Sequence, residues 1–367
     1  MLPQRAELMT LHLHVGHGKT GSSFLQSWLA LNRSGLWREA NLLYLPGQAD
    51  ASARAGGFSM GNGDVLDHAL DLYEHPQQFR RWWFRVQQQT LRAIGITHGS
   101  NAAGAVFSAE RWTRQLPVRI DRLLQFADAC DFEEVRIWLL VRDPLDHAVS
   151  VYGQMVKRHG FRGSLDEWLS IYDFPKVLQA FLQAVQSRSE RFHLKVTHYG
   201  NERQRLLEAL RQWLMLADGG DWQHPAQWTI NRSLTADELL LMRWLNGHIG
   251  ERAAAIGERL VDCLPQLTAA RPQPSASALT RFEQHWRSTI SDINASMPAH
   301  AALQMPCADE SMALLPCFDQ EAGQISLSTA QLDCLFEGIR SINKLSPLRR
   351  LRFKRWLKRF SSSFLSR

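Results

Sequence analysis

Cysteine is scarce in this 367-residue sequence, and no pattern puts it to structural use. The five cysteines are odd in number, and no two of them form a C-x-x-C pair. This spacing argues against a disulfide framework and against a structural zinc site, and it suits a reducing compartment. The sequence offers no other cluster of metal-ligand residues, so we expect no metal.

Long apolar runs are absent as well. No uncharged apolar run approaches the ~18 residues that a membrane-spanning helix requires. The first residues hold scattered apolar side chains rather than the apolar core of a secretory signal, so we expect a cytoplasmic protein. What is present is typical of a globular protein: 45% hydrophobic residues, 21% charged residues and enough length for a sizeable core. The net charge of +6 suits an anionic ligand or surface.

The hydrophobic pattern alternates between strand and helix up to about residue 216. Strands are expected at 11–16, 41–46, 103–110, 135–144 and 191–199. Helices are expected at 22–33, about 64–95, 145–158 and 202–216. This alternation predicts an α/β fold with a P-loop-like, doubly wound parallel sheet flanked by helices.

Helical patterning dominates from about residue 234. The clearest piece is "LTADELLLMRWLN", with Thr235 as its expected N-cap, and "TAARPQPSASALT" (268–280) is typical of a linker. We therefore divide the chain into three consecutive parts. They are a core at 1–245, a mostly helical extension or cap at 246–345, and a basic amphipathic tail at 346–367.

The tail includes the segment 348–360, which carries seven basic and no acidic residues. Its apolar side chains fall mostly on one helical face, which suits an anionic membrane surface and a location on the inner face of the membrane. The plain alternative is a solvated terminus. We expect no nucleic-acid partner, because no recognised binding module accompanies the charge.

The stretch "HVGHGKTGSS" (14–23) follows a short apolar alternation and opens a helix. Gly18-Lys19-Thr20 matches the end of a Walker A loop, but Leu13 stands where that loop needs its first glycine. What remains is a strand, a turn and a helix N-terminus, which offer backbone N–H groups, a lysine and three hydroxyls. The stretch therefore predicts an anion site.

Polar residues also follow two later strands. Ser108 and Glu110 stand in "FSAERW", and Arg142 stands in "VRDPLDHAVSVY" with Ser150 eight residues further on. The Arg142 guanidinium and the Ser150 hydroxyl suit a shared phosphate, although Arg142 alternatively pairs with a nearby aspartate. Ligands of open α/β sheets bind beyond the carboxyl ends of the strands, so we expect these residues near the loop.

The two motifs together resemble the sulfotransferases that use 3′-phosphoadenosine 5′-phosphosulfate (PAPS), most closely the bacterial, carbohydrate-type members. The resemblance rests on a strand followed by Lys-Thr-Gly-Ser-Ser and a later strand followed by Arg-Asp-Pro, with a serine eight residues after the arginine. It extends through "FSAERW" and "NRSLTADE", over roughly residues 10–245. It implies a 5′-phosphosulfate loop of Lys19, Thr20, Gly21, Ser22 and Ser23, and 3′-phosphate contacts from Arg142 and Ser150.

The resemblance implies transfer of a sulfuryl group from PAPS to a hydroxyl of a carbohydrate or glycolipid, with release of 3′,5′-adenosine bisphosphate. Such transfer depends on positioning and electrostatic stabilisation. Lys19 is expected to neutralise charge on the bridging oxygen, with no metal required. Arg232, in "NRSLT", is a further candidate for the nucleotide or an ordinary arginine at a helix start.

The base that takes the acceptor's proton has two candidates. Glu110 stands where many members of the family have a His or Glu, and His68, with Asp64 behind it, is the alternative. Glu110 alternatively forms an ion pair with Arg111 or Arg114.

Two other functions remain open. One is a P-loop kinase that uses ATP and magnesium, against which stand Leu13 in the loop and Arg142 in the place of a metal-binding aspartate. The other is a non-catalytic, membrane-associated protein that binds a nucleotide without turnover.

Overall fold

The computed structural model describes residues 9–47, 59, 61–96, 102–217, 219–225, 232–305 and 325–343. Contacts divide the chain into two compact units that interleave along the sequence. The first unit comprises Met1–His147, Tyr172–Ile230 and Arg281–Cys307, and the second comprises Ala148–Ile171, Asn231–Thr280 and Ala308–Arg367. The three consecutive parts expected from the sequence do not anticipate this interleaving. The basic segment 348–360 lies outside the described residues, so its membrane partner stays a prediction.

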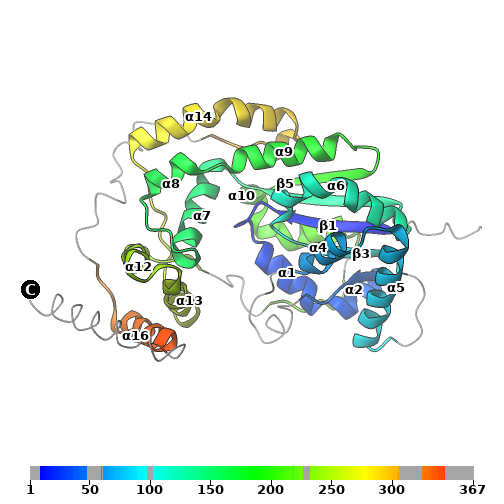
Figure 1. Cartoon of the computed structure of the whole chain (residues 1–367), viewed down its shortest axis with the longest axis horizontal. Coiled ribbons are helices and arrows are strands. Elements are labelled where there is room, and N and C mark those ends of the chain that lie inside the picture. The colour runs from blue at the N-terminus through cyan, green and yellow to red at the C-terminus, as the bar shows by residue number, and fades with distance from the viewer. Residues whose placement is uncertain are drawn as a thin grey trace, which may run out of the picture. The chain divides into compact units, whose positions relative to one another are not determined.

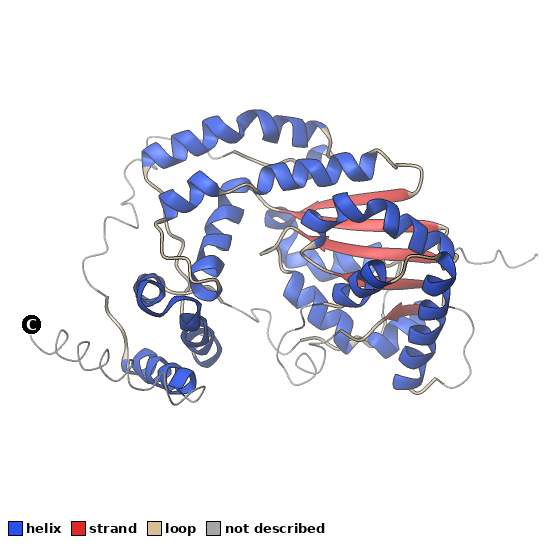
Figure 2. Ribbon diagram, in the orientation of Figure 1, coloured by secondary structure: helices blue, strands red, loops and turns tan. Residues whose placement is uncertain are grey.

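The first unit is built on a five-stranded, wholly parallel sheet in the order β2-β3-β1-β4-β5 (Figures 1 and 2). Its strands are β1 (Thr10–Gly16), β2 (Leu42–Tyr44), β3 (Gly104–Ser108), β4 (Glu134–Val141) and β5 (Phe192–His198). The α/β fold with a parallel sheet flanked by helices is therefore confirmed. β1 is buried along its whole length because it lies at the centre of the sheet, with strands on both sides and helices on both faces.

One face of the sheet is covered by helices that follow β1 and β5. They are α1 (Ser22–Leu31), α2 (Arg33–Ala40), α10 (Tyr199–Glu202), the 3₁₀ turn η1 (Arg203–Arg205) and α11 (Leu206–Trp213). Trp28 of α1 and Leu210 of α11 belong with Trp138 of β4 to one buried hydrophobic cluster. Transfer of such large apolar side chains from water is the main stabilising contribution of this layer.

The rest of the first unit includes α4 (Gly63–Leu72), α5 (Pro76–Ala93), α6 (Trp112–Ala129), α9 (Phe174–Gln186) and η3 (Ala299–Ala301). The single helix expected near 64–95 is in fact two helices. Pro76 begins the second helix, because a proline cannot continue the hydrogen bonding of the first. Trp82 and Trp83 of α5 pack on Phe126 of α6 and are buried, so they belong to the core.

The second unit is helical in its described residues, as the sequence predicts for the C-terminal region. Its helices are most of α7 (Pro144–Arg158), then α8 (Leu165–Ile171), α12 (Ala236–Ile249), η2 (Gly250–Ala253), α13 (Ala254–Cys263) and α16 (Thr329–Asn343). Thr235 is confirmed as the N-cap of α12, since its hydroxyl accepts the N–H of Glu238. None of the described helices is long and apolar enough to cross a membrane.

The linker expected at 268–280 ends early, because α14 (Ala276–Ala295) begins inside it. The Ser275 hydroxyl accepts the N–H of Ala278 and donates to Asp166. Ser275, which the sequence places in a linker, therefore caps a helix.

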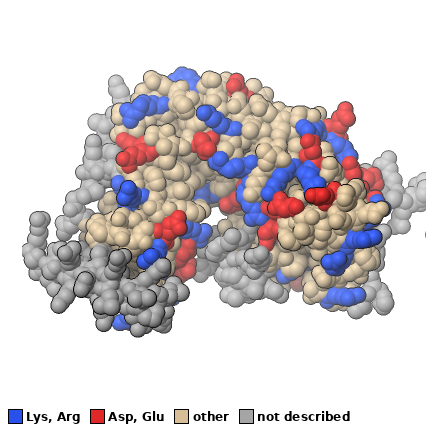
Figure 3. All heavy atoms as spheres, in the orientation of Figure 1, with Lys and Arg blue, Asp and Glu red and all other residues tan. Residues whose placement is uncertain are grey.

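Lysine and arginine side chains are interspersed with aspartate and glutamate side chains on the face of the molecule shown in Figure 3.

Candidate active site

The carboxyl ends of β1, β3 and β4 meet at one edge of the sheet because all strands are parallel. The chain passes from β1 to β2 and β3 on one side of β1, and then crosses to β4 on the other side. Ligands of open α/β sheets bind at such a switch point, beyond the strand ends. The three polar motifs predicted from the sequence follow these three strands.

The loop after β1 has an unusual backbone conformation. Gly18, Lys19 and Gly21 have φ values of 66°, 55° and 80°, and a non-glycine residue in this left-handed region is uncommon. The loop also folds tightly on itself, since a Cβ on Gly16 would lie 2.2 Å from the Ser22 hydroxyl oxygen. α1 then begins at Ser22, where first-turn N–H groups lack helical carbonyl partners and carry partial positive charge.

The side chains of this loop divide into buried and partly exposed. Thr20 and Ser22 are buried, and their hydroxyl oxygens lie 3.5 Å apart. Lys19 and Ser23 are partly exposed, and the Ser23 carbonyl accepts the Ser27 hydroxyl. The loop therefore combines a rigid polar base with a lysine that solvent reaches.

Arg142, at the end of β4, is bonded to this loop. Its Nη1 donates to the Lys19 carbonyl at 3.2 Å, and its backbone N–H donates to His17 Nδ1 at 3.3 Å. The guanidinium lies 5.7 Å from the centroid of the Tyr199 ring and 3.8 Å from an Asp146 oxygen. Two motifs 123 residues apart in sequence are thus direct neighbours.

Ser150 lies on α7 and is partly exposed. Arg142 belongs to the first compact unit and Ser150 to the second. Their shared contact with a phosphate therefore stays a prediction from the sequence spacing.

Glu110 lies in the turn between β3 and α6, against the loop. Its Cγ is 3.3 Å from where a Cβ on Gly16 would lie, and its Oε2 is 3.9 Å from where a Cβ on Gly18 would lie. The arginines considered as its partners bind other carboxylates: Arg111 binds Asp67 at 2.7 Å and Arg114 binds Asp173 at 3.0 Å. The structure therefore brings Glu110 to the lysine loop.

His68 is exposed on α4. The residue before it, Asp67, is buried and accepts the indole N–H of Trp112 as well as a guanidinium N–H of Arg111. His68 therefore lies at the surface of α4, whereas the Glu110 side chain lies against the loop.

A buried polar network fixes the end of β3 next to Glu110. Gln26 of α1 donates to the Ser108 hydroxyl oxygen at 3.1 Å, and His14 Nδ1 lies 2.8 Å from the same oxygen. A hydroxyl oxygen can accept two hydrogen bonds and donate one, so the tautomer of His14 decides the direction of the bond between Ser108 and His14. The Asn62 side chain accepts the Ser108 N–H and donates to the Val106 carbonyl. The sequence analysis missed this network, since its members come from four separate segments.

A second network, also missed, lies beneath the loop. His147 Nε2 contacts the His17 carbonyl oxygen, and its Nδ1 lies 2.6 Å from the Tyr172 hydroxyl. A carbonyl only accepts, so Nε2 carries the proton and the Tyr172 hydroxyl donates to Nδ1. The rings of His17 and His147 are stacked with centroids 4.1 Å apart. This arrangement holds the residue before Gly18 in place.

Asp143 follows Arg142 and is occupied within the chain. Its Oδ1 accepts from His198 Nε2 at 3.0 Å and from the Gln304 N–H at 2.7 Å. Burial acts to raise the pKa of Asp143, but these hydrogen bonds outweigh it and hold the pKa below its usual value. The Asp143 carboxylate thus connects the end of β4 to β5 and to residue 304. The metal-binding aspartate of a kinase has a different role.

The structure contradicts the prediction that Arg232 contacts the nucleotide. Its guanidinium is buried and spends all five donors inside the second unit, on Glu238 and on backbone carbonyls. Burial acts to raise the pKa of Glu238, but hydrogen bonds from Arg232 and Gln331 hold it below its usual value. Arg232 therefore secures the start of α12 and has no donor left for a nucleotide.

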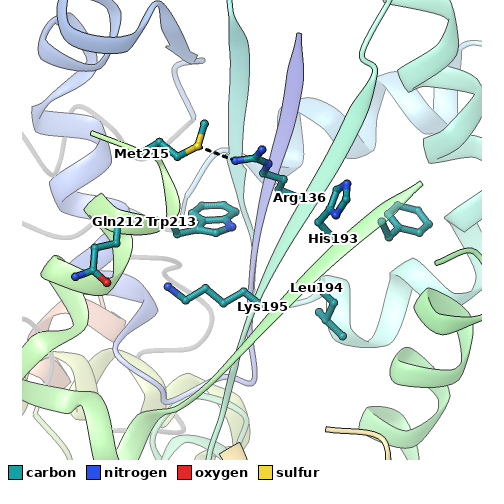
Figure 4. A pocket seen from close by; sticks show the side chains of 8 residues that line it. Arg136, His193, Leu194, Lys195, Gln212, Trp213 and Met215 are labelled. Carbon is teal, nitrogen blue, oxygen red and sulfur yellow. Dashed lines mark hydrogen bonds between the residues drawn. The ribbon is translucent and has the colours of Figure 1, made fainter. Parts of the chain in front are cut away.

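An open hollow of about 490 Å³ lies elsewhere, at the amino-terminal halves of β4 and β5 (Figure 4). Arg136 and Lys195 line it together with Trp213, and Arg136 is paired with Glu134 at 2.9 Å. Charged side chains on an edge strand such as β5 commonly prevent pairing with other sheets. The hollow lies at the strand ends opposite to the candidate active site. Within the described residues, no group of His, Cys, Asp or Glu side chains is arranged to hold a metal ion.

Acid is expected to destabilise the fold through its buried histidines. Burial lowers the pKa of His14 and His147 to about 3, and burial with the charge of Arg136 does the same for His12. Unfolding returns each pKa to about 6.5, so between about pH 6.5 and pH 3 the unfolded chain binds more protons. Above about pH 6.5 these histidines therefore do not lower the free energy of unfolding. Below that pH, each of them lowers it by up to ~1.4 kcal/mol per pH unit.

Urea unfolding at several pH values checks this expectation. The free energy of unfolding should fall steadily below about pH 6.5. In His147→Gln its slope against pH should be smaller by the contribution of one histidine, about 1.4 kcal/mol per pH unit. A free energy that stays level between about pH 6.5 and pH 5 would contradict it.

No family model matches the chain, and no curated protein matches it. Among solved structures, it is similar to a sulfotransferase from Alicyclobacillus acidocaldarius, with 13% identity, a TM-score of 0.38 and coverage of 77% of this chain and 94% of that one. It is also similar to the sulfotransferase domain from the curacin biosynthetic pathway, with 13% identity, a TM-score of 0.29 and coverage of 91% and 98%. A retinol dehydratase in complex with androsterone and inactive cofactor PAP matches at 9% identity, a TM-score of 0.25 and coverage of 92% and 81%. TM-scores this low do not assign a function, so the function has to be inferred from this chain's own residues.

Proposed function

We propose that the protein transfers a sulfuryl group from PAPS to a hydroxyl of a carbohydrate or glycolipid and releases 3′,5′-adenosine bisphosphate. One observation carries the proposal: the Arg142 guanidinium donates to the Lys19 carbonyl at the switch point of the sheet. A donor with anionic groups at both its 3′ and 5′ positions requires two cationic motifs side by side. The loop and Arg142 supply them.

The residues of the loop act as an anion cradle. The first-turn N–H groups of α1 and the hydroxyls of Thr20, Ser22 and Ser23 face the 5′-phosphosulfate in this proposal, with Arg142 and Ser150 on the 3′-phosphate. The acceptor oxygen forms a bond to sulfur while the bond from sulfur to the bridging oxygen breaks. Lys19 stabilises the charge that collects on the leaving nucleotide.

Glu110 is the proposed base. Its side chain lies against Gly16 and Gly18, which belong to the same loop as Lys19. It takes the proton of the acceptor hydroxyl as the new bond to sulfur forms. The exposed position of His68 gives no comparable support.

The kinase alternative is less well supported by the site. A P-loop kinase holds magnesium with an acidic residue at the end of a strand near the loop. Here Arg142 follows the last residue of β4, and the next residue, Asp143, is hydrogen-bonded to His198 and Gln304. Leu13 also lies within buried β1, where a Walker loop would need a glycine.

The acceptor class rests on the resemblance of the motifs to carbohydrate-type sulfotransferases. The tryptophan pair that suits stacking on a sugar does not add to it, because Trp82 and Trp83 are buried in the core. Screening of sugars and glycolipids with radiolabelled PAPS identifies the acceptor.

Binding of 3′,5′-adenosine bisphosphate is expected to raise the melting temperature without any metal. A ligand that binds only the folded protein stabilises it by about 2.7 kcal/mol at one hundred times its Kd. Arg142→Ala should lose most of this shift. Arg80→Ala is the matched control and should keep it, because Arg80 is an exposed arginine of α5 that pairs with Asp131.

The same measurement with ATP and magnesium separates the alternatives. A shift with ATP and magnesium but none with the bisphosphate would overturn the proposal and favour a kinase. If the bisphosphate binds but no acceptor receives a sulfuryl group, the non-catalytic binding protein becomes the better description.

A further inference from the structure

Two cysteines of the second unit lie side by side. Cys263 is the last residue of α13, and Cys334 lies on α16, close enough for the two thiols to interact electrostatically. Both are free cysteines in the structure, and Cys263 is exposed whereas Cys334 is buried. One thiol of the pair is therefore open to a reagent and the other is shielded from it.

The helices that carry these thiols pack closely and run antiparallel. Arg259, one turn before Cys263, is paired with Glu337, about one turn after Cys334. Further along, a Cβ on Gly338 would lie 3.0 Å from the Ile256 Cα. Residue numbers thus fall along α13 as they rise along α16, and the missing side chain of Gly338 lets the two backbones approach. A disulfide needs such a close approach of two backbones.

The surroundings also distinguish the two thiols chemically. Burial, with the neighbouring Cys263, raises the pKa of the Cys334 thiol. Cys263 is therefore the thiol that meets an oxidant first, and Cys334 the one that reacts second.

We propose that Cys263 and Cys334 form a reversible disulfide when the protein meets a peroxide, and that this site is a redox modification site separate from the candidate active site. The proposal does not depend on the proposed function. Peroxide-sensitive cysteines are typically accessible and placed beside a second cysteine that resolves the first product.

The reaction balances with hydrogen peroxide as the oxidant. The Cys263 thiolate attacks one peroxide oxygen, the O–O bond breaks, and hydroxide leaves to give a sulfenic acid on Cys263. The Cys334 sulfur then attacks the Cys263 sulfur, the S–O bond breaks, and the S–S bond forms. In sum, two thiols and one peroxide give one disulfide and two waters, and two electrons pass from sulfur to oxygen.

The disulfide would close a covalent loop that includes α14 and residue 304. The Gln304 N–H donates to Asp143, the residue after Arg142. Oxidation would also fix α16, the last described helix before the basic segment 348–360, to α13. Cross-linking of a long loop stabilises a protein mainly by restricting its unfolded chain.

Alkylation and mass spectrometry of the full-length protein test the proposal. The reduced protein is treated with hydrogen peroxide, its free thiols are then blocked, and its peptides are analysed. We expect Cys263 and Cys334 to escape alkylation together and to appear as one linked pair of peptides. Dithiothreitol should return both to the alkylated form. The melting temperature should rise on oxidation and fall again on reduction.

Two variants make the test specific. Cys263→Ser, at an exposed position, should lose both the linked peptides and the rise in melting temperature. Cys130→Ser should keep both, because Cys130 is buried in the first unit. The proposal is overturned if both thiols stay open to alkylation. It is also overturned if Cys263 pairs with a different cysteine, or if peroxide carries Cys263 to a sulfinic acid with Cys334 still free.

Discussion

Replacement of Lys19 by alanine is expected to lower kcat for sulfuryl transfer by about 100- to 1,000-fold while the protein remains folded. Lys19 is the cationic side chain of the loop after β1, and it is partly exposed between a buried polar base and solvent. Negative charge develops on the nucleotide as the bond from sulfur to the bridging oxygen breaks. A lysine that contacts this charge lowers the barrier more than it strengthens ground-state binding, so the loss should appear mainly in kcat.

The backbone of Lys19 allows a control for loop geometry. Its φ of 55° lies in the left-handed region, where glycine is at ease and most other residues are strained. Lys19→Gly should therefore keep the loop conformation but remove the amine. If the alanine and glycine variants lose the same activity, the amine is responsible rather than the shape of the loop.

A matched lysine elsewhere completes this test. Lys176 is an exposed lysine of α9, and Lys176→Ala should leave kcat unchanged. Full transfer activity in Lys19→Ala would contradict the proposed role of the loop. Circular dichroism and bisphosphate-induced stabilisation show whether each variant is folded.

Replacement of Glu110 by glutamine is expected to lower kcat by about 100- to 10,000-fold, the range that a positioned base contributes. Glutamine keeps the size of Glu110 and can still form hydrogen bonds, but it is uncharged and cannot take a proton. The side chain lies against Gly16 and Gly18, so the change falls on the loop that holds the donor. Affinity for 3′,5′-adenosine bisphosphate should change little.

His68→Gln is the matched comparison. Because His68 is exposed on α4, this variant should transfer at close to the wild-type rate. The pH profile gives a second readout, since Glu110→Gln should lose the rise in kcat that accompanies deprotonation of the base. A large loss in His68→Gln with little loss in Glu110→Gln would reverse the assignment.

The positions of the loop, Glu110 and Arg142 were open to prediction because each follows a strand with a strong local signal. The run "IWLLV" before Arg142 is nearly continuous in apolar residues, and the structure buries it as a central strand. Parallel strands place their carboxyl ends at one edge, so local patterns alone predicted that these residues gather there. The precise neighbours were not predictable: the bond from Arg142 to Lys19 joins residues 123 apart.

The supports of the site had no local signal at all. In the sequence, residues 148–171 of the second unit separate His147 from Tyr172. Nothing in the sequence around either residue indicates the hydrogen bond between them. For Arg232 the sequence left two alternatives open, a nucleotide contact or an ordinary arginine at a helix start. Only its burial against Glu238 shows that the guanidinium is already used.

The sequence by itself determined the five strands, the helix that begins after the loop and the cap of α12 by Thr235. These follow from hydrophobic periodicity, helix ends and side-chain chemistry, which act over a few neighbouring residues. Tertiary structure alone decided the interleaving of the two units, the networks around Ser108 and His147, and the meeting of Cys263 with Cys334. Those contacts join segments far apart in the chain, and their formation depends on how whole layers pack, which no short stretch of sequence records.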